Sequence, residues 1–233
     1  MSYTKRVDGR KFDETREMEA KIGIIKNAGG SALFKFGDTI AIAAVYGPKP
    51  LHPQHLQNPS KGVLRCNYDM LSFSVTERKR PGPSRRSQEI SKVSEWALSS
   101  IVDLDAYPNT VVDVHIMILQ ANASTRCAGI NAAALALASA GVSMKELVSS
   151  VSIGKIDDKI VVDLIKEEED CEEGEGATDI PMAFTKSGKI CLLQLDGKIR
   201  PEELKEAIKA GKKACKEVYN VQKKALKGVE GKD

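Results

Sequence analysis

The sequence lacks any apolar run long enough to cross a membrane, and its opening residues, MSYTKRVDGRK, lack the apolar core of a signal peptide. We therefore expect a cytoplasmic protein that makes no contact with a membrane. The chain has 233 residues, of which 42% are apolar and 29% charged, as in soluble globular proteins. This length suits one large domain or two small ones and can bury a sizeable core.

Cysteine and histidine are scarce and scattered. There are five cysteines and three histidines, and no two cysteines form a CxxC pair. An odd number of widely spaced cysteines in a cytosolic chain favours free thiols. The spacing argues against both a disulfide framework and a zinc site. The cysteines are Cys66, Cys127, Cys171, Cys191 and Cys215.

A large excess of one charge is also absent. The chain carries 35 Lys and Arg against 32 Asp and Glu, so its formal net charge is +3. The protein is therefore not basic overall, and any site for a polyanion must come from local clustering of basic residues.

Apolar patterns predict runs of strands with helices inserted between them, which favours an α+β fold. We expect a polar, extended N-terminal arm over 1–16, a single folded domain over 17–227 and a polar tail over 228–233. A long loop at 47–62 is rich in Pro, His and Asn, and loops of this length are usually functional or mobile. The expected strands are 17–25, 31–36, 39–46, 63–75, 110–119, a hairpin over 151–164, 180–185 and 190–195; the expected helices are 84–102, 127–140, a short one from the capping box Ser143–Glu146, and a long one from Pro201.

Two basic clusters separated by prolines form the stretch RKRPGPSRR at 78–86. Arg85 and Arg86 fall in the first turn of an expected helix, where the helix dipole disfavours positive charge. A bound phosphate would relieve this mismatch, and arginine grips phosphate oxygens in a two-pronged way. The alternative is a solvated, charged loop, and composition alone leaves the two readings balanced.

The stretch ANASTRCAG at 121–129 lies between an expected strand and an expected helix. Ser124 or Thr125 is able to cap that helix, and the freed backbone N–H groups and Arg126 would then converge on one spot that suits an anion. The alternative is an ordinary N-cap with a surface arginine, and taken alone this alternative is favoured because Ser and Thr caps are common.

A third cluster is the acidic stretch KEEEDCEEGEGATD at 166–179, which ends at the start of an expected strand. Crowded carboxylates raise one another's pKa, so one of them can act as an acid near neutral pH, and they also attract divalent metal. A solvated acidic loop is the alternative. Together the three clusters suit phosphoryl transfer from a phosphodiester to inorganic phosphate, a reaction that depends mainly on positioning and charge neutralisation.

The chain resembles the RNase PH family, and within it the catalytic RNase PH-like subunits of archaeal exosomes. The resemblance covers about 5–227. It is carried by RVDGRKFDETR, FGDT, RPGPSRRSQEISK, LQANASTRCAGINAAALALASAGVSM, VVDLIKEEED, TDIPMAF and LLQLDGKI. The basic stretch and TDIPMA are the more specific of these.

The resemblance implies a ribosomal protein S5 domain 2-like α+β fold with mixed sheets and packed helices. It implies 3′→5′ phosphorolysis of RNA, with inorganic phosphate as co-substrate and nucleoside diphosphates as products, and the reverse tailing reaction. It also implies a hexameric ring, built as a trimer of heterodimers with a related non-catalytic RNase PH-like subunit, and RNA-binding cap subunits above it.

Site residues follow from the resemblance position by position. Asp170 is implied as the general acid, although the lengthened acidic loop leaves Glu169 as an alternative. Asp179 is implied as its carboxylate partner and as a contact for Mg²⁺. The implied phosphate ligands are Ser124, Thr125 and Arg126, and the implied RNA ligands are Arg85, Arg86 and, with the loop at 47–62, Arg65.

The sequence departs from the family pattern at the phosphate turn. Ser124 stands where Gly is usual, and Asn122 stands where Asp is usual. The side chain of Ser124 either crowds the backbone donors or adds a hydroxyl donor. Two other functions therefore remain open: a non-catalytic RNA-binding scaffold subunit of such a ring, and a homohexameric RNase PH that trims tRNA ends.

Overall fold

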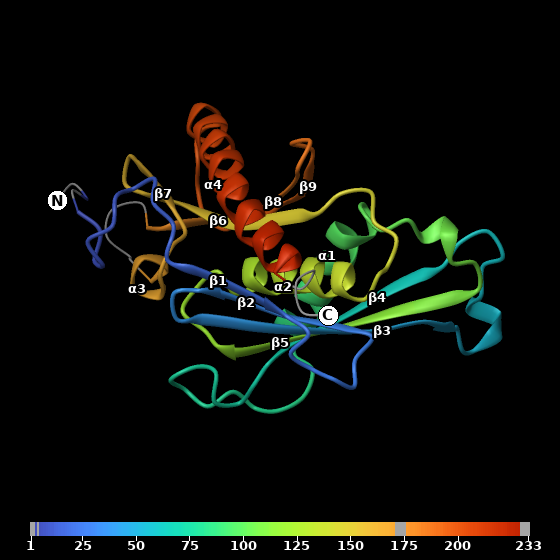
Figure 1. The fold of residues 1–233 in the computed structure, drawn as a ribbon. Helices are drawn as coiled ribbons and strands as arrows, with labels where there is room; N and C mark the ends of the chain where they lie inside the picture. The colour runs from blue at the N-terminus through green and yellow to red at the C-terminus, as the bar shows by residue number, and fades with distance from the viewer. Residues whose placement is uncertain (1–2, 4, 171–175, 229–233) are drawn as a thin grey trace.

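The computed structural model describes Tyr3, 5–170 and 176–228, and it contains two sheets with helices between and outside them (Figure 1). The elements of the first half are β1 (Met18–Ile22), β2 (Gly30–Phe36), β3 (Thr39–Pro50), η1 (Gln54–Leu56), β4 (Val63–Met70), α1 (Arg85–Ser99), η2 (Leu104–Ala106), β5 (Thr110–Gln120) and α2 (Thr125–Ser139). Those of the second half are β6 (Val148–Ile156), β7 (Lys159–Val162), α3 (Lys166–Glu169), β8 (Thr178–Thr185), β9 (Ile190–Leu193) and α4 (Pro201–Lys227).

The larger sheet has five strands in the order β1-β2-β3-β5-β4. Its pairs are antiparallel except for β4 and β5, which run parallel because α1 connects them as a crossover. The expected alternation in β5 is confirmed, since Val112, Val114, Ile116 and Ile118 are all buried. One face of this sheet therefore forms the floor of the main core.

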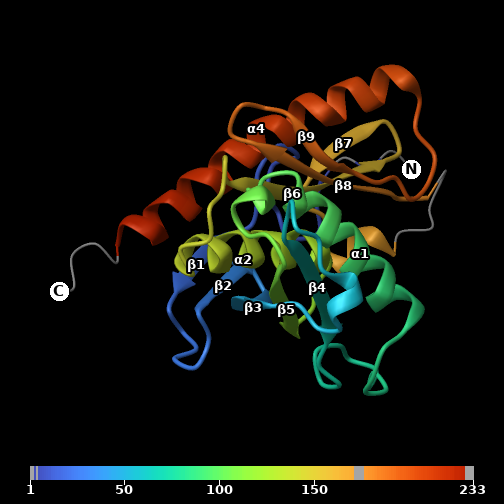
Figure 2. The same ribbon diagram turned by 90° about the vertical axis from the view of Figure 1, so that its right-hand side faces the viewer.

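The smaller sheet has the order β7-β6-β8-β9, and the expected hairpin of β6 and β7 is present with its turn at Asp157 and Asp158. Every residue of β6 is buried. The reason is that β6 contacts α2 on one side and α4 on the other. The order of layers is thus the larger sheet, α2, the smaller sheet and α4 (Figures 1 and 2).

The central helix α2 is apolar all round, as a helix buried between two sheets must be. Its alanines let the sheets approach closely. At one end Gly30 packs so tightly that an added Cβ would lie 2.3 Å from the backbone nitrogen of Ala140. At the middle, Asn131 exchanges two hydrogen bonds with the backbone of Ser150, which attaches α2 to β6.

The C-terminal helix α4 begins at Pro201, as expected, with Glu202 and Glu203 in its first turn. Its buried residues include Cys215 and Val218, two members of the expected apolar stripe. Figure 2 shows α4 crossing the smaller sheet and continuing past it. No helix among the described residues is long and apolar enough to cross a membrane.

One expected helix is absent from the described residues. The Ser143–Glu146 stretch forms no helix, because its groups are engaged elsewhere. Met144 pairs with Val102 in an isolated bridge, and the Glu146 carboxylate accepts the backbone N–H of Ser187 at 2.8 Å. The capping-box prediction was therefore wrong. The short helix α3 was not predicted.

The prediction of free thiols agrees with the four described cysteines, Cys66, Cys127, Cys191 and Cys215, which are unpaired. Cys171 lies outside the described residues.

Candidate active site

The three charged clusters come from elements that pack against one another. The first turn of α1 carries the arginines, the turn before α2 carries the expected anion site, and the start of β8 carries Asp179. Helix α2 contacts both α1 and β8, so it joins all three. The clusters that the sequence grouped by chemistry are therefore also connected through the fold.

Arg126 extends from the first turn of α2 between α1 and the end of β9. Its guanidinium donates to the side-chain oxygen of Gln194 and lies 3.5 Å from Glu89 Oε1. Gln194 Nε2 donates to the same Glu89 oxygen at 2.7 Å. Glu89 stands one helical turn after Arg85 and Arg86, so Arg126 faces the basic end of α1.

One reading of the sequence expected the Ser124 side chain to cap α2, but it does not do so. Ser124 precedes the helix in the left-handed region with a φ of 52°, directly after Ala123 with a φ of 54°. Its hydroxyl instead donates to Asp163 Oδ1 at 3.0 Å. A left-handed backbone suits the glycine that the family resemblance implies at this position. Thr125 follows as the first helical residue and is buried.

Tyr68 on β4 is a site residue that the sequence did not suggest, because it lies within an ordinary buried strand. Its hydroxyl is near Thr125, yet no described group completes a hydrogen bond of normal geometry with it. Burial raises the pKa of Tyr68 to about 12, against the opposing effects of Thr125, Arg86 and Arg126. A buried, unsatisfied hydroxyl beside two arginines is a group that a bound anion could satisfy.

Asp179 is the second residue of β8 and exchanges two backbone hydrogen bonds with Asp196. Burial raises the pKa of Asp179, and the charges of Glu169 and Asp196 add to this rise. A hydrogen bond from the Ser152 hydroxyl and the charge of Arg126 oppose it. The expected effect of crowded carboxylates therefore falls on Asp179, which Arg126 is close enough to influence.

Asp170 occupies a different environment from Asp179. It ends α3, its side chain is 59% exposed, and its carboxylate lies 2.5 Å from Lys166 Nζ. Lys166 Nζ also lies 4.0 Å from the carboxylate of Glu169, the alternative general acid. The rest of the acidic stretch, 171–175, lies outside the described residues.

Arg85 and Arg86 are both exposed in the first turn of α1, and no acidic residue accompanies them there. The helix begins with a capping box of Ser84 and Ser87, so its start is fixed without an acidic residue. The predicted placement of two arginines at a helix start is confirmed. Their side chains are available to a ligand with negative charge.

Arg65 is not brought into this cluster. It pairs with Asp113 at 2.8 Å, and Lys49 joins the same carboxylate at 2.7 Å. Asp113 lies near the start of β5, whereas the 121–126 turn follows its end, roughly 23 Å away by the rise of a strand. A contact of Arg65 with RNA would therefore occur well away from the reacting end.

A metal site is only partly provided. Within the ranges that the structure describes, no three His, Cys, Asp or Glu residues gather closely enough to hold an ion. Mg²⁺ is commonly bound by one or two carboxylates together with water and substrate phosphates. Asp179 suits such a site only when an RNA or phosphate oxygen completes it.

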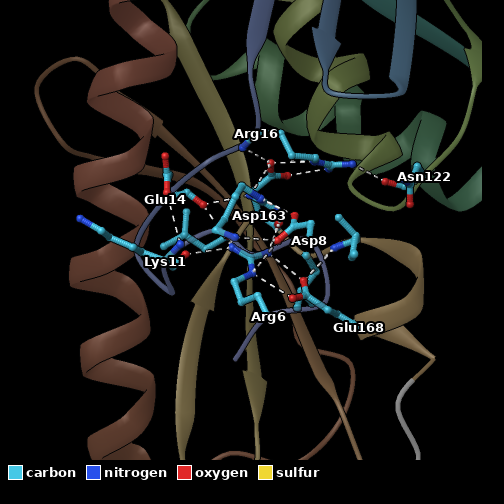
Figure 3. A network of polar contacts seen from close by, with 12 residues as sticks. Arg6, Asp8, Lys11, Glu14, Arg16, Asn122, Asp163 and Glu168 are labelled. Carbon is cyan, nitrogen blue, oxygen red and sulfur yellow. Dashed lines mark hydrogen bonds and ion pairs between the residues drawn. The ribbon is translucent and has the colours of Figure 1, made fainter. Parts of the chain in front are cut away.

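The N-terminal arm is attached to the folded domain by two buried arginines, which the sequence did not indicate. Arg6 and Arg16 are buried, and they pair with Glu168 and Asp163 respectively (Figure 3). The motif RVDGRKFDETR contains both arginines, so the resemblance of this motif to the family was the one feature of the sequence that could have drawn attention to them. What the motif could not give was the partner of each arginine, which lies 162 residues away for Arg6 and 147 residues away for Arg16.

Comparison with known proteins gives a consistent result. The sequence pattern of the 3′ exoribonuclease family (RNase PH), domain 1, matches 14–143, and that of domain 2 matches 146–214. The boundary falls between α2 and β6. The family patterns thus treat as two domains the region that we expected to be a single domain.

Several archaeal proteins resemble the chain over nearly its whole length. The exosome complex component Rrp41 of Methanopyrus kandleri is 49% identical over 229 residues, covering 98% of this chain and 94% of that protein. The protein of the same name from Pyrococcus furiosus is 50% identical over 224 residues, covering 96% and 88%.

Two solved structures share the fold. Rice (Oryza sativa) Rrp46 superposes with a TM-score of 0.83 at 25% identity, covering 95% of this chain and 100% of that one. A chain of the Archaeoglobus fulgidus exosome, solved with RNA bound to the active site, superposes with a TM-score of 0.80 at 24% identity, covering 93% and 92%.

Proposed function

Because the chain belongs to the 3′ exoribonuclease family, we propose that it is a phosphate-dependent 3′→5′ exoribonuclease and a subunit of an exosome. The identity of about half its residues with Rrp41 exosome components over almost the full length supports this function. The structural observation that carries it is the position of Arg126. This arginine lies between the basic start of α1 and the carboxyl of Asp179.

The reaction transfers a nucleotide to phosphate rather than to water. An oxygen of inorganic phosphate attacks the last phosphodiester of the RNA, and the bond from that phosphorus to the preceding 3′ oxygen breaks. The released nucleotide is a nucleoside diphosphate. The departing 3′ oxygen takes a proton and becomes the new RNA end. The enzyme is thus a phosphorolytic transferase, and the term hydrolase does not describe it.

We assign the attacking phosphate to Thr125, Arg126 and the turn at Ser124. Arg126 neutralises its charge, and the start of α2 attracts anions through its dipole. The arginine currently pairs with Glu89 and Gln194, two weak partners that a phosphate can replace. The Tyr68 hydroxyl, unsatisfied at this place, supports an anion here.

We assign the RNA backbone to Arg85 and Arg86, whose exposed guanidinium groups suit consecutive phosphates. We assign Arg65 to a stretch of RNA farther from the cleaved end.

Two carboxyls are candidates for the proton that the departing 3′ oxygen needs. Asp179 has the environment of a proton donor, since burial raises its pKa. Asp170 has the role by family resemblance, and it would have to leave Lys166 to perform it. Asp179 in its ionised form is the residue that would hold Mg²⁺, which would neutralise phosphate charge; the proton would then come from Asp170.

A scaffold subunit that binds RNA without cleaving it is the main alternative. Such a subunit would have no need for Arg126, Thr125 or the acidic pair, and this chain has all of them. For assembly we propose a hexameric ring with a related non-catalytic subunit, and RNA-binding cap subunits above it. A homohexamer would instead form from this chain alone, and a sizing column separates the two cases.

Degradation of a 5′-labelled oligoadenylate tests the function. The full chain is assayed alone and with its ring partner, in Mg²⁺, with and without inorganic phosphate. We expect shortening only with phosphate and ADP as the product. The variant Arg126→Glu should shorten no RNA while keeping the circular dichroism spectrum of the fold. Shortening without phosphate, or unchanged activity of Arg126→Glu, would reject the assignment.

A further inference from the structure

The N-terminal arm reaches the proposed phosphate site through Asp163, which pairs with Arg16 and, at 3.6 Å, with Arg10. Arg16 Nε donates to Asp163 Oδ2 at 2.8 Å, and Arg16 Nη2 donates to Asp163 Oδ1 at 2.7 Å (Figure 3). The backbone N–H of Arg16 adds a third bond to Oδ2 at 2.9 Å. The Asp163 side chain is completely buried. Arg16 therefore fixes the orientation of this carboxylate.

The same arginine also holds the backbone of the turn before α2. Arg16 Nη1 donates to the carbonyl oxygen of Asn122 at 2.6 Å, as Figure 3 shows. The Thr39 hydroxyl lies at hydrogen-bond distance from the same carbonyl and accepts the N–H of Asn122. The turn is thus attached at Asn122 to a residue more than a hundred positions earlier in the chain.

Asp163 completes the connection through Ser124. Its Oδ1 atom, oriented by Arg16, accepts the Ser124 hydroxyl at 3.0 Å. Ser124 and Ala123 both have a left-handed backbone, a conformation that residues other than glycine rarely adopt. A hydrogen bond to a fixed buried carboxylate is a direct way to hold a serine in that conformation. Because the hydroxyl is used in this way, the Ser124 side chain does not cap the first N–H groups of α2.

We propose that Arg16 and Asp163 are positioning residues for phosphate. They hold the Ser124 hydroxyl, and through it the left-handed turn that sets the start of α2 and Arg126 in place. The proposal rests on the proposed function, since it assigns the co-substrate of that reaction to this turn. It also explains how the chain has serine where the family pattern has glycine. Glycine adopts the turn without help, whereas serine does so with the Asp163 hydrogen bond.

The connection continues toward the catalytic carboxyl. The backbone N–H of Asp163 donates to the carbonyl of Ser152 at 2.8 Å, and the Ser152 hydroxyl bonds to Asp179. Both ends of the proposed site are therefore attached to β6 at one residue. A displacement of Asp163 would move Ser124 first, because the Asp163 side chain bonds directly to the Ser124 hydroxyl.

A matched pair of substitutions at Ser124 tests the proposal. Ser124→Ala removes the hydroxyl and keeps the Cβ that disfavours a left-handed backbone. Ser124→Gly removes both. We expect Ser124→Ala to raise the phosphate concentration for half-maximal rate by about tenfold. The free-energy cost of a left-handed backbone corresponds to a factor of that order, and in Ser124→Ala no hydrogen bond to Asp163 offsets it. Ser124→Gly should be much less impaired than Ser124→Ala, and in both variants the maximal rate should change less than the phosphate dependence.

Three further variants separate the arm's contribution. Arg16→Met and Asp163→Asn should behave like Ser124→Ala. Lys213→Met breaks a different contact of the arm, its 3.0 Å ion pair with Asp13, and should change nothing. If Ser124→Gly is as impaired as Ser124→Ala, the hydroxyl binds phosphate directly and the proposal is wrong. It is also wrong if Ser124→Ala matches wild type.

Hydrogen exchange keeps this test independent of activity. In the full chain, backbone amides at 122–127 should exchange faster in Ser124→Ala and Arg16→Met than in wild type, and at the wild-type rate in Lys213→Met. Equal exchange in all variants overturns the positioning role even if the enzyme is phosphorolytic. Faster exchange in a protein that never uses phosphate would instead support the link and reject the proposed function.

Discussion

Glu89 Oε1 lies 3.5 Å from Arg126 Nη1, with Gln194 bonded to both side chains. The pair joins the second turn of α1 to the first turn of α2, and Glu89 is 44% exposed. An exposed ion pair of this kind contributes little free energy. The guanidinium is thus held in place without phosphate, yet a phosphate that binds Arg126 has only a weak partner to displace.

Glu89→Gln should therefore strengthen phosphate binding. Without the carboxylate, Arg126 loses the ion pair that competes with phosphate, and we expect the half-saturating phosphate concentration to fall about threefold, the size of an exposed ion pair. Initial rates at varied phosphate measure this. Glu95→Gln on the same helix is the control, because Glu95 pairs with Lys92 and not with Arg126. A rise in the half-saturating concentration would mean that Glu89 helps to orient Arg126 for catalysis.

Asp179→Asn should abolish turnover while RNA binding persists, because the proposed role of Asp179 concerns the leaving oxygen and not the RNA backbone. Since its pKa is raised, the wild-type rate should fall as pH increases through that pKa, where the proton is lost. The raised pKa also means that ionised Asp179 opposes folding, so the variant should be at least as stable as wild type near pH 7. Rates and Tm values from pH 4 to 8 measure both effects.

Asp170→Asn is the comparison that separates the two carboxyls. If Asp179 holds the proton, the alkaline fall in rate should survive in Asp170→Asn. If Asp170→Asn removes that pH dependence, Asp170 is the acid that the family resemblance implies, and its pair with Lys166 opens during catalysis.

Replacing both Arg85 and Arg86 by Ala should weaken RNA binding and reduce its dependence on salt. Each lost phosphate contact lowers the slope of log affinity against log salt concentration by about 0.7 for single-stranded RNA. Titration of a labelled oligonucleotide at several salt concentrations measures the slope. Replacing Arg78 and Arg80 together provides a control within the same basic loop. An unchanged slope in the first variant would mean that these two arginines are simply solvated.

The sequence predicted most of the fold because its signals were local. The alternation in β5, the proline and glutamates at the start of α4 and the alanines of α2 each report on their own element. The same locality explains the error at Ser143–Glu146. A capping box describes what a helix start would use, and it cannot show that Glu146 is already bonded to Ser187.

At the site, the sequence identified charged residues but not their partners. It placed Arg126 and Asp179 in one site, which the structure supports through the effect of Arg126 on the pKa of Asp179. It offered Ser124 or Thr125 as the helix cap, because the acceptor of the Ser124 hydroxyl, Asp163, lies 39 residues away. Buried ion pairs between the arm and the hairpin end depend on tertiary packing and leave no periodic pattern.

The buried pair of Arg6 and Glu168 should account for much of the arm's contribution to stability. Arg6 donates to both carboxylate oxygens, at 2.9 Å and 2.7 Å, and its remaining nitrogen donates to the carbonyl of Val162 at 2.8 Å. Neither side chain of the pair is exposed. Arg6→Met leaves a buried carboxylate without its partner, which costs about 3–5 kcal/mol of unfolding free energy.

The dependence on pH gives this last prediction its sign. Burial alone would raise the pKa of Glu168, but hydrogen bonds from Arg6 and Tyr3 hold it below the usual value. A lowered pKa stabilises the fold above the unfolded pKa of about 4.3, and this stability is lost as pH falls. Wild type should therefore lose stability below about pH 5. In Arg6→Met the Glu168 carboxyl has lost its cationic partner, so its protonated form is favoured. The difference in unfolding free energy between wild type and Arg6→Met should therefore be smallest in acid.

Denaturant unfolding at pH 3.5, 5 and 7 measures this difference, with Lys213→Met as the exposed-pair control. A deficit for Arg6→Met that is the same at all three pH values would mean that packing, and not the charge of Glu168, is what the arginine provides.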